Sequence, residues 1–478
     1  MQKESLLNVL QKKGIIINSP CGGNGTCRKC LVKVGGKKIL ACKTFDFNEN
    51  DKIEIISNEN MEVINVYESL HKNKIDRNIN FGVSIDIGTT TVAFELINVT
   101  SGKNLAAFSC INKQRAYGAD VISRIKSANE GNLDVLKKCI HDDILNGINE
   151  IITKAGLVLS DIGMVVIAGN ETMLHLLQGL PCETLGIYPF TPVTVGIKKV
   201  NFNEIFDSKL ICDLVVLPGI STFVGADISA GLLHCGFLKN DEVNLLIDLG
   251  TNGEMALQTP GKIYVTSTAA GPAFEAGNIS CGVGSVKGAI AKVNFSKETG
   301  VFMYKTIENK EAVGICGTGV VDITAELVKY SLIDETGLLE DAEINLTKTI
   351  TFTQKDIREV QLAKSAVRTG IEILLETAEC KYEDIKNVYL AGGFGYKMNV
   401  NSAATIGLIP SKLKERVIAV GNASLGGATK VLLSEIEEST IIKISSIAEE
   451  VNIAKHPKFN ELFMDYMTFE KSGLNARH

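Results

Sequence analysis

The chain has 478 residues, of which 45% are hydrophobic and 22% charged, and its formal net charge is −6. A chain of this length is too long for a single hydrophobic core, which predicts two to four domains. The mild acidity, with no basic block, argues against nucleic acid as the main partner. No apolar run approaches the roughly 20 residues of a spanning helix, and the first residues do not resemble a signal peptide. We therefore expect a cytoplasmic protein with no membrane partner.

Residues 1–60 form a small predicted domain. Leu6, Leu7 and Leu10 share one face of a short helix, and Gly35–Gly36 indicates a tight hairpin turn. Residues 61–80 are polar and without a period, which predicts a linker. The strands expected in this part cover residues 30–34, 38–41 and 52–56.

Four of the twelve cysteines lie close together in this small domain, namely Cys21, Cys27, Cys30 and Cys42. Their C-x5-C-x2-C-x11-C spacing is similar to that of plant-type ferredoxins, in which cysteine thiolates hold a 2Fe–2S cluster. Three glycines between the first two cysteines allow the loop to wrap around such a cluster. The competing interpretation is structural zinc, which usually takes two C-x2-C pairs where this chain has one.

The remaining eight cysteines are scattered singly along the chain. Single cysteines of this kind are usually small buried hydrophobic residues. We expect this of Cys281 and Cys316 in particular.

From residue 81 the pattern alternates between strands and helices and repeats itself. Asp86 and Asp248 each end an apolar strand and precede a glycine turn, about 160 residues apart. This repeat predicts two related α/β halves, a first lobe at 81–240 and a second at 241–478, which includes a C-terminal helix at 456–469. Other helices are predicted at 121–129, 134–154, from 172, 318–330 and 356–379, and further strands at 164–168 and 387–390.

The two glycine turns are candidate phosphate sites, because backbone N–H groups in such turns cradle phosphate and nearby carboxylates bind Mg²⁺ with its waters. We assign Asp86 and Asp248 to the coordination of Mg²⁺ and its waters. Glu254 or Glu171 could orient the attacking water. The residues expected to hold the phosphates of ATP are Gly88, Thr89, Thr90 and Thr91, with Gly250, Thr251, Asn252 and Gly253.

Gly392 and Gly393 follow a predicted strand and could let a purine and ribose lie against the backbone. Two further glycine-rich loops, at 270–275 and 314–319, are either nucleotide contacts or tight turns. The chain has neither a Walker A sequence nor a G-x-G-x-x-G after its first strand, which disfavours those nucleotide-binding folds.

In this order and spacing, the three motifs resemble those of the sugar-kinase, heat-shock and actin (ASKHA) superfamily. With the cysteine motif, the chain resembles the reductive activators of corrinoid proteins, which use ATP to return Co(II) corrinoid to Co(I). The segments that carry the resemblance are PCGGNGTCRKC, VSIDIGTTTVA, YGADVISRI, AGNETMLHLLQGL, DLGTNGEMAL, GPAFEAGNISCG, GICGTGVVDI, VQLAKSAVRTGIEILL and YLAGGFG.

The resemblance implies an α/β chain in which a small α+β ferredoxin-like (β-grasp) domain precedes a duplicated ASKHA domain. It also implies a homodimer, a low-potential electron donor and a corrinoid protein partner from a methyltransferase system. The departure from the family lies in the middle, where about 20 linker-like residues replace a sizeable extra domain.

A physical argument also supports the coupling of ATP hydrolysis to electron transfer. Electron transfer downhill from a cluster with a potential near about −400 mV needs no nucleotide. An ATPase attached to such a cluster therefore suggests uphill transfer, driven by a nucleotide-dependent change of conformation. Three alternatives remain open: a small-molecule kinase with an auxiliary cluster, an ATP- and redox-responsive sensor without turnover, and an activator of dehydratase-type radical enzymes. The ferredoxin-like spacing speaks against the last, whose cluster is of the 4Fe–4S type.

Overall fold

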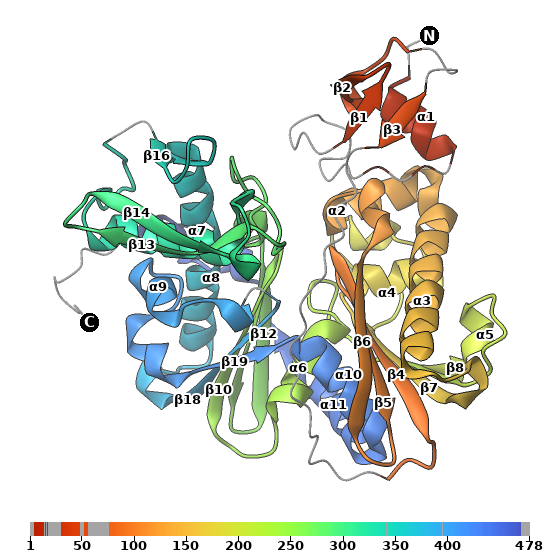
Figure 1. Ribbon diagram of the computed structural model, residues 1–478. Helices are drawn as coiled ribbons and strands as arrows, with labels where there is room; N and C mark the ends of the chain where they lie inside the picture. The colour runs from red at the N-terminus through yellow and green to blue at the C-terminus, as the bar shows by residue number, and fades with distance from the viewer. Residues whose placement is uncertain are drawn as a thin grey trace. The chain divides into compact units, whose positions relative to one another are not determined.

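The structure is a computed structural model that describes residues 4–13, 15, 17, 30–47, 52–55, 76–340, 343–393 and 395–469. The chain divides into two compact units (Figure 1). The predicted lobe boundaries stay a prediction, and the structure adds that Ala428–Glu438 packs with the first unit. The first unit comprises Met1–Glu62, Val66–Ala226 and Ala428–Glu438, and the second comprises Val63–Asn65, Asp227–Gly427 and Ser439–His478.

The described residues of the N-terminal part form one helix and a three-stranded antiparallel sheet of order β2-β1-β3. Gly35 and Gly36 have φ angles of +55° and +83° and form the predicted tight hairpin. Leu6, Leu7 and Leu10 are buried and line the small core, which confirms the predicted helix face. The elements are α1 (Leu6–Lys12), β1 (Leu31–Val34), β2 (Lys37–Leu40), the 3₁₀ turn η1 (Ala41–Lys43) and β3 (Ile53–Ile55).

A six-stranded sheet of order β6-β5-β4-β7-β9-β8 forms the centre of the first unit. Strands β4, β5 and β6 are an antiparallel meander, whereas β7 and β9 continue from β4 in parallel. The middle strands read as continuous apolar runs because both of their faces are covered. The strands are β4 (Phe81–Ile87), β5 (Thr91–Asn98), β6 (Lys103–Ile111), β7 (Ile162–Gly169), β8 (Lys198–Asn201) and β9 (Asp213–Val216).

The long helix α3 packs on β5 and β6 (Figure 1). Gly147 makes this close approach possible, because a β-carbon there would lie 2.3 Å from the ring of Phe94. The other face of the sheet contacts helix α10, where a β-carbon on Gly82 would lie 2.5 Å from Leu432. The helices are α2 (Val121–Ser127), α3 (Leu133–Ala155), α4 (Glu171–Gln178), α5 (Phe202–Ile205) and α10 (Ala423–Leu433).

The second unit repeats the strand order of the first. Its sheet has the order β12-β11-β10-β18-β19, extended by β20 beside β12, so an antiparallel meander again meets two parallel strands. This match confirms the predicted pair of related α/β halves. The strands are β10 (Val243–Leu249), β11 (Gly253–Thr259), β12 (Lys262–Thr268), β18 (Ile385–Ala391), β19 (Val417–Gly421) and β20 (Ala448–Glu450).

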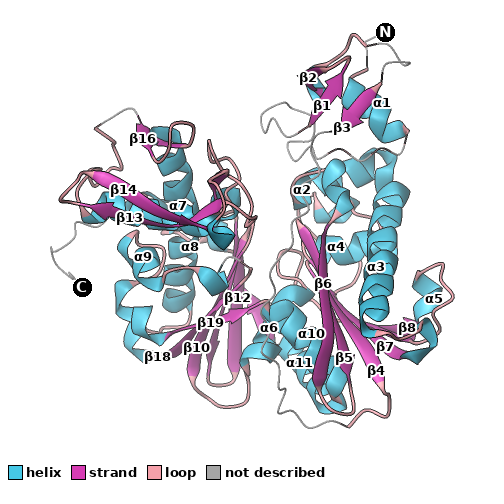
Figure 2. Cartoon of the chain, viewed as in Figure 1, coloured by secondary structure: helices cyan, strands magenta, loops and turns pink. Residues whose placement is uncertain are grey.

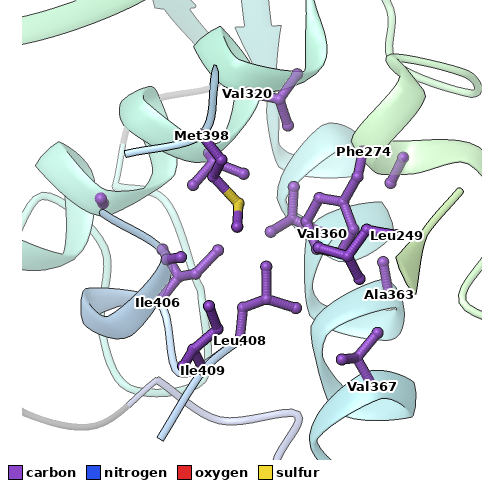
Figure 3. Close-up of a cluster of buried hydrophobic side chains, with 14 of the residues drawn as sticks. Leu249, Phe274, Val320, Val360, Ala363, Val367, Met398, Ile406, Leu408 and Ile409 are labelled. Atoms are coloured by element: carbon purple, nitrogen blue, oxygen red, sulfur yellow. The ribbon is translucent and has the colours of Figure 1, made fainter. Parts of the chain in front are cut away.

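Helix α8 is the centre of the apolar core of the second unit, and Val360, Ala363 and Val367 extend from it into the core (Figure 3). Figure 2 shows further strands outside the main sheet that the sequence analysis did not predict. They are β13 (Ala289–Ser296), β14 (Val301–Thr306), β15 (Gly314–Ile315), β16 (Glu343–Asn345) and β17 (Thr351–Thr353). The helices are α6 (Ala226–Cys235), α7 (Gly317–Lys329), α8 (Gln354–Thr377), α9 (Val400–Thr405), α11 (Glu435–Ile447) and α12 (Phe459–Asp465).

The polar residues of the VQLAKSAVRTG segment hold residues 466–468 against α8. Lys364 is 2% exposed, and its Nζ donates to the carbonyl oxygens of Tyr466 (2.5 Å) and Thr468 (2.7 Å). Gln361 Nε2 donates to the Met467 carbonyl oxygen at 2.6 Å. These contacts satisfy carbonyls beyond the end of α12, so this part of the motif is structural.

Candidate nucleotide turns and cysteine centre

The turn after β4 is closed by a hydrogen bond from the Gly88 N–H to the Thr91 carbonyl oxygen, at 2.9 Å. Two of its carbonyl oxygens accept hydrogen bonds from side chains elsewhere in the first unit. Asn112 Nδ2 donates to the Gly88 carbonyl oxygen at 3.0 Å, and the Arg124 guanidinium donates to the Thr89 carbonyl oxygen. Because the C=O and N–H of a trans peptide point in opposite directions, the N–H groups of Thr89 and Thr90 point away from this support, which suits an anion.

Arg124 is fully buried in α2, and burial lowers the pKa of its guanidinium to about 9. It also donates to the Gly118 carbonyl oxygen at 3.0 Å and contacts Met173 Sδ at 3.0 Å. A buried guanidinium is stable only where its donors find acceptors, and here the acceptors belong to the turn and its surroundings. Sequence reasoning missed Asn112 and Arg124, although Arg124 lies in the YGADVISRI segment.

The turn after β10 is also closed by a backbone hydrogen bond, but it is one residue shorter than the turn after β4. The Gly250 N–H donates to the Asn252 carbonyl oxygen at 3.0 Å. Thr251 Oγ1 donates to Glu275 Oε2 at 2.7 Å, so the loop at 270–275 contacts a predicted phosphate residue. In the loop at 314–319, the close approach of Gly319 to the Ile290 carbonyl oxygen, where a β-carbon would lie 2.3 Å away, is a packing requirement.

The two predicted metal-site aspartates occupy equivalent places. Asp86 lies one residue before the end of β4 and Asp248 one residue before the end of β10, and both are partly buried. Glu254 is the cross-strand partner of Asp248. Burial raises the pKa of the Glu254 carboxyl well above its ordinary value, and the negative charges of Asp227 and Asp248 raise it further. Burial and the two neighbouring negative charges therefore disfavour the charged form of the Glu254 carboxyl.

Gly392 follows β18 with a φ of +91°. A β-carbon there would lie 2.5 Å from the Leu249 carbonyl oxygen and 2.9 Å from Asp248 Oδ1. Glycine is thus required both by its backbone conformation and by its approach to the aspartate. Gly393 is exposed beside it. The structure therefore brings the predicted adenosine glycine Gly392 next to Asp248, the aspartate predicted to bind Mg²⁺ in the second unit.

Glu171, the other candidate for orienting water, begins α4 directly beyond β7. Strand β7 pairs with β4 in parallel, with Gly169 opposite Ile87. The carboxyl ends of neighbouring parallel strands are where α/β sheets bind ligands. Glu171 and the turn after β4 thus lie at the same edge of the sheet, and Glu171 is 2% exposed.

Two of the four predicted cluster ligands are described, and they converge. Cys30 precedes β1 and Cys42 lies in the turn after β2, and the two sulfur atoms are 3.2 Å apart in the small core. The separation exceeds the roughly 2.05 Å of a disulfide bond. Cys21 and Cys27 lie outside the described residues. The thiols that are described fit a shared thiolate site.

Three of the scattered cysteines are buried, as predicted, and the other five are partly buried. Burial raises the pKa of the Cys139 and Cys182 thiols to about 11, so both are protonated and unreactive at neutral pH. Cys316 is buried and donates to the Ile290 carbonyl oxygen at 3.3 Å. The partly buried Cys281 accepts from the Thr351 N–H at 3.5 Å.

Within the described ranges, no three His, Cys, Asp or Glu side chains are arranged to hold a metal ion. Mg²⁺ in phosphoryl-transfer sites usually takes only one or two carboxylates, with waters and substrate phosphates completing its shell.

No helix in the described part of the chain is both long and apolar enough to cross a membrane.

Comparisons with known proteins agree with this arrangement. Residues 81–240 match the family described as "RACo middle region", and residues 242–477 match "C-terminal domain of RACo the ASKHA domain". The corrinoid activation enzyme RamQ of Eubacterium limosum is 31% identical, over 97% of this chain and 96% of its own. The chain belongs to the reductive activators of corrinoid proteins.

Another relative of this reductive activator is the [Co(II) methylated amine-specific corrinoid protein] reductase of Methanosarcina barkeri. It is 26% identical over 82% of this chain and 78% of its own. A solved structure described as a reductive activator for corrinoid, iron-sulfur protein is 27% identical and superimposes with a TM-score of 0.77, covering 97% of this chain and 95% of its own. The predicted ASKHA fold is thereby confirmed, and the N-terminal helix and sheet are consistent with a ferredoxin-like module.

Proposed function

We propose that this protein uses ATP to drive the reduction of a corrinoid protein from Co(II) to Co(I). The observation that carries the proposal is the similarity to a corrinoid activation enzyme along 97% of the chain. One electron is added to the cobalt of the substrate protein in each event. ATP hydrolysis to ADP and phosphate supplies the free energy for an uphill transfer, by favouring one conformation of the complex.

For the nucleotide, we propose that the turns after β4 and β10 both contribute to the binding of ATP and Mg²⁺. The outward N–H groups of Thr89 and Thr90 support a phosphate role for the first turn. Asp86 and Asp248 would bind Mg²⁺ through its waters. Thr91, Thr251 and their neighbouring glycines complete the proposed phosphate sites.

Gly392 and Gly393 would leave room for the adenosine of ATP, since Gly393 is exposed. Between the two candidate glutamates, the raised pKa of Glu254 favours Glu171 as the carboxylate that accepts a hydrogen bond from the attacking water.

For the electron, we propose that Cys21, Cys27, Cys30 and Cys42 hold a 2Fe–2S cluster. The support is the approach of Cys30 Sγ to Cys42 Sγ inside an apolar core. Such a cluster, when bound, supplies single electrons at a potential near about −400 mV. The proposal requires a low-potential electron donor. From the family resemblance, we also propose that the protein is a homodimer.

The test is a corrinoid reduction assay under anaerobic conditions. The purified protein is mixed with a low-potential reductant and a Co(II) corrinoid protein, with ATP present or absent, and the visible spectrum of the cobalt centre is followed. We expect Co(I) to form only with ATP and Mg²⁺. Reduction at the same rate without ATP would contradict the proposal, and phosphorylation of a small molecule without any protein partner would favour a kinase.

A further inference from the structure

Glu171 has one carboxylate oxygen occupied and the other without a partner. Oε1 lies 3.1 Å from His175 Nδ1. Oε2 is buried and has no hydrogen-bond partner among the residues that the structure describes. Buried polar atoms are almost always hydrogen-bonded in folded proteins, and an unpaired carboxylate oxygen is costly. Such an atom is expected where a water or ligand supplies the missing hydrogen bond.

His175 is fully buried one turn further along α4. Its Nε2 lies 3.0 Å from the backbone nitrogen of Val193, which can only donate a hydrogen bond. Nε2 therefore carries no hydrogen and the ring hydrogen is on Nδ1, because the partner of one ring nitrogen sets the tautomer. Nδ1–H then faces the Glu171 carbonyl oxygen at 3.0 Å and Oε1 at 3.1 Å. Val193 therefore fixes the imidazole ring through Nε2, and the ring in turn donates a hydrogen bond to Glu171 through Nδ1.

Two glycines lie close to Glu171, one at its carboxylate and one at its backbone. A β-carbon on Gly219 would lie 2.3 Å from Glu171 Oε2, and one on Gly225 would lie 2.4 Å from the Glu171 backbone nitrogen. Gly219 lies just beyond β9, the parallel neighbour of β7. The imidazole and Gly219 at the carboxylate, with Gly225 at the backbone, leave Glu171 little freedom at the edge of the sheet that carries the turn after β4.

We propose that His175 is a positioning residue for ATP hydrolysis, which orients Glu171 so that Oε2 receives the attacking water. This inference rests on the proposed ATPase activity. In the step, the water oxygen bonds to the γ-phosphorus while the bond from phosphorus to the bridging oxygen of ADP breaks. The proton lost by the water passes to Oε2 and is then released to solvent.

A pair of isosteric variants of the full-length protein separates this role from a purely structural one. The amide of Asn reaches the position of Nδ1, so His175→Asn keeps a donor for Glu171 and loses the acceptor for Val193. The amide of Gln reaches the position of Nε2, so His175→Gln does the reverse.

We expect His175→Gln and Glu171→Gln to lower kcat for ATP hydrolysis by about 10²-fold. His175→Asn should stay within about tenfold of the wild type. The dissociation constant for a non-hydrolysable ATP analogue should be unchanged in all three. A His175→Gln variant that hydrolyses ATP as fast as His175→Asn, or faster, would overturn the positioning role, as would an unaffected Glu171→Gln variant.

Glycine variants provide a test that leaves the histidine in place. Gly219→Ala should push Glu171 Oε2 aside and lower kcat with ATP affinity kept. Gly196→Ala is the matched control, because its β-carbon would meet its nearest atom at an ordinary 3.5 Å. Equal rates for these two variants would contradict the proposal. Wild-type protein that hydrolyses ATP but does not reduce cobalt would count against the proposed function alone.

Discussion

The sulfur atoms of Cys30 and Cys42 lie 3.2 Å apart, although eleven residues separate the two cysteines in the chain. The hairpin of β1 and β2 causes this approach, because it pairs Leu31 with Leu40. The Ala41 N–H also donates to the Cys30 carbonyl oxygen at 2.9 Å. A fourth ligand that follows after only eleven residues is therefore compatible with a shared site, since the hairpin returns the chain to its starting point.

Replacement of these cysteines should remove the cluster. We expect about two irons and two acid-labile sulfides per chain in anaerobically purified protein, and loss of both in Cys30→Ser and Cys42→Ser, because serine is a poor substitute for a thiolate ligand. Cys212→Ser is the control, since Cys212 is buried in the other part of the first unit. Metal and sulfide analysis decides the matter, and stoichiometric zinc without sulfide would refute the assignment.

Loss of either turn aspartate should impair ATP hydrolysis. Asp86→Ala or Asp248→Ala should lower turnover by a factor on the order of 10² or more, because each removes a carboxylate that positions Mg²⁺ during phosphoryl transfer. Hydrolysis is measured by phosphate release, and the visible absorption of the cluster should stay unchanged in both variants. If neither substitution alters turnover, the phosphate assignment of the two turns is wrong.

Substitution of Gly392 should weaken ATP binding more than substitution of a glycine that has a similar backbone conformation elsewhere in the chain. Gly392→Ala should weaken ATP binding by about tenfold, or about 1.4 kcal/mol, since its β-carbon would displace Asp248 or the backbone of Leu249. Gly261→Ala is a matched control, with a φ of +74° and open space around its β-carbon. Titration with an ATP analogue measures both, and equal affinities would show that Gly392 is required only for the turn.

Glu95 should make the stability of the first unit depend on pH. Burial raises the pKa of its carboxyl from the ordinary 4.5 to about 7, although hydrogen bonds from Thr429 and Asn104 oppose the shift. The folded state then binds the proton more tightly than the unfolded state. The stability is therefore highest below about pH 4.5, falls as the pH rises to about 7, and is constant above.

The difference amounts to at most about 3 kcal/mol, from the size of the shift. Glu95→Gln should abolish this part of the pH dependence, because the amide does not titrate. Chemical unfolding of both proteins at pH 5 and pH 8 measures the effect. If the wild type and the variant lose the same free energy of unfolding between pH 5 and pH 8, Glu95 is not the source of the pH dependence.

The sequence by itself determined the local features of this protein. The glycine pair of the first hairpin, the spacing of the cysteines and the two aspartate–glycine turns are signals carried within a few residues, so their interpretation needs no distant contact. The repetition of one such turn about 160 residues later also predicted the duplicated sheet, because related strands preceded both turns.

Only the tertiary structure decided which distant side chains support these features. Arg124 reaches the carbonyl of Thr89, and Thr429 reaches Glu95 across 334 residues of sequence. Val193 fixes the tautomer of His175. A residue pattern records which side chains can donate or accept hydrogen bonds, but the choice among many possible partners depends on how helices pack on the sheets, which is a long-range property of the chain. For that reason the turns could be predicted from the sequence, whereas the groups that hold and orient them could not.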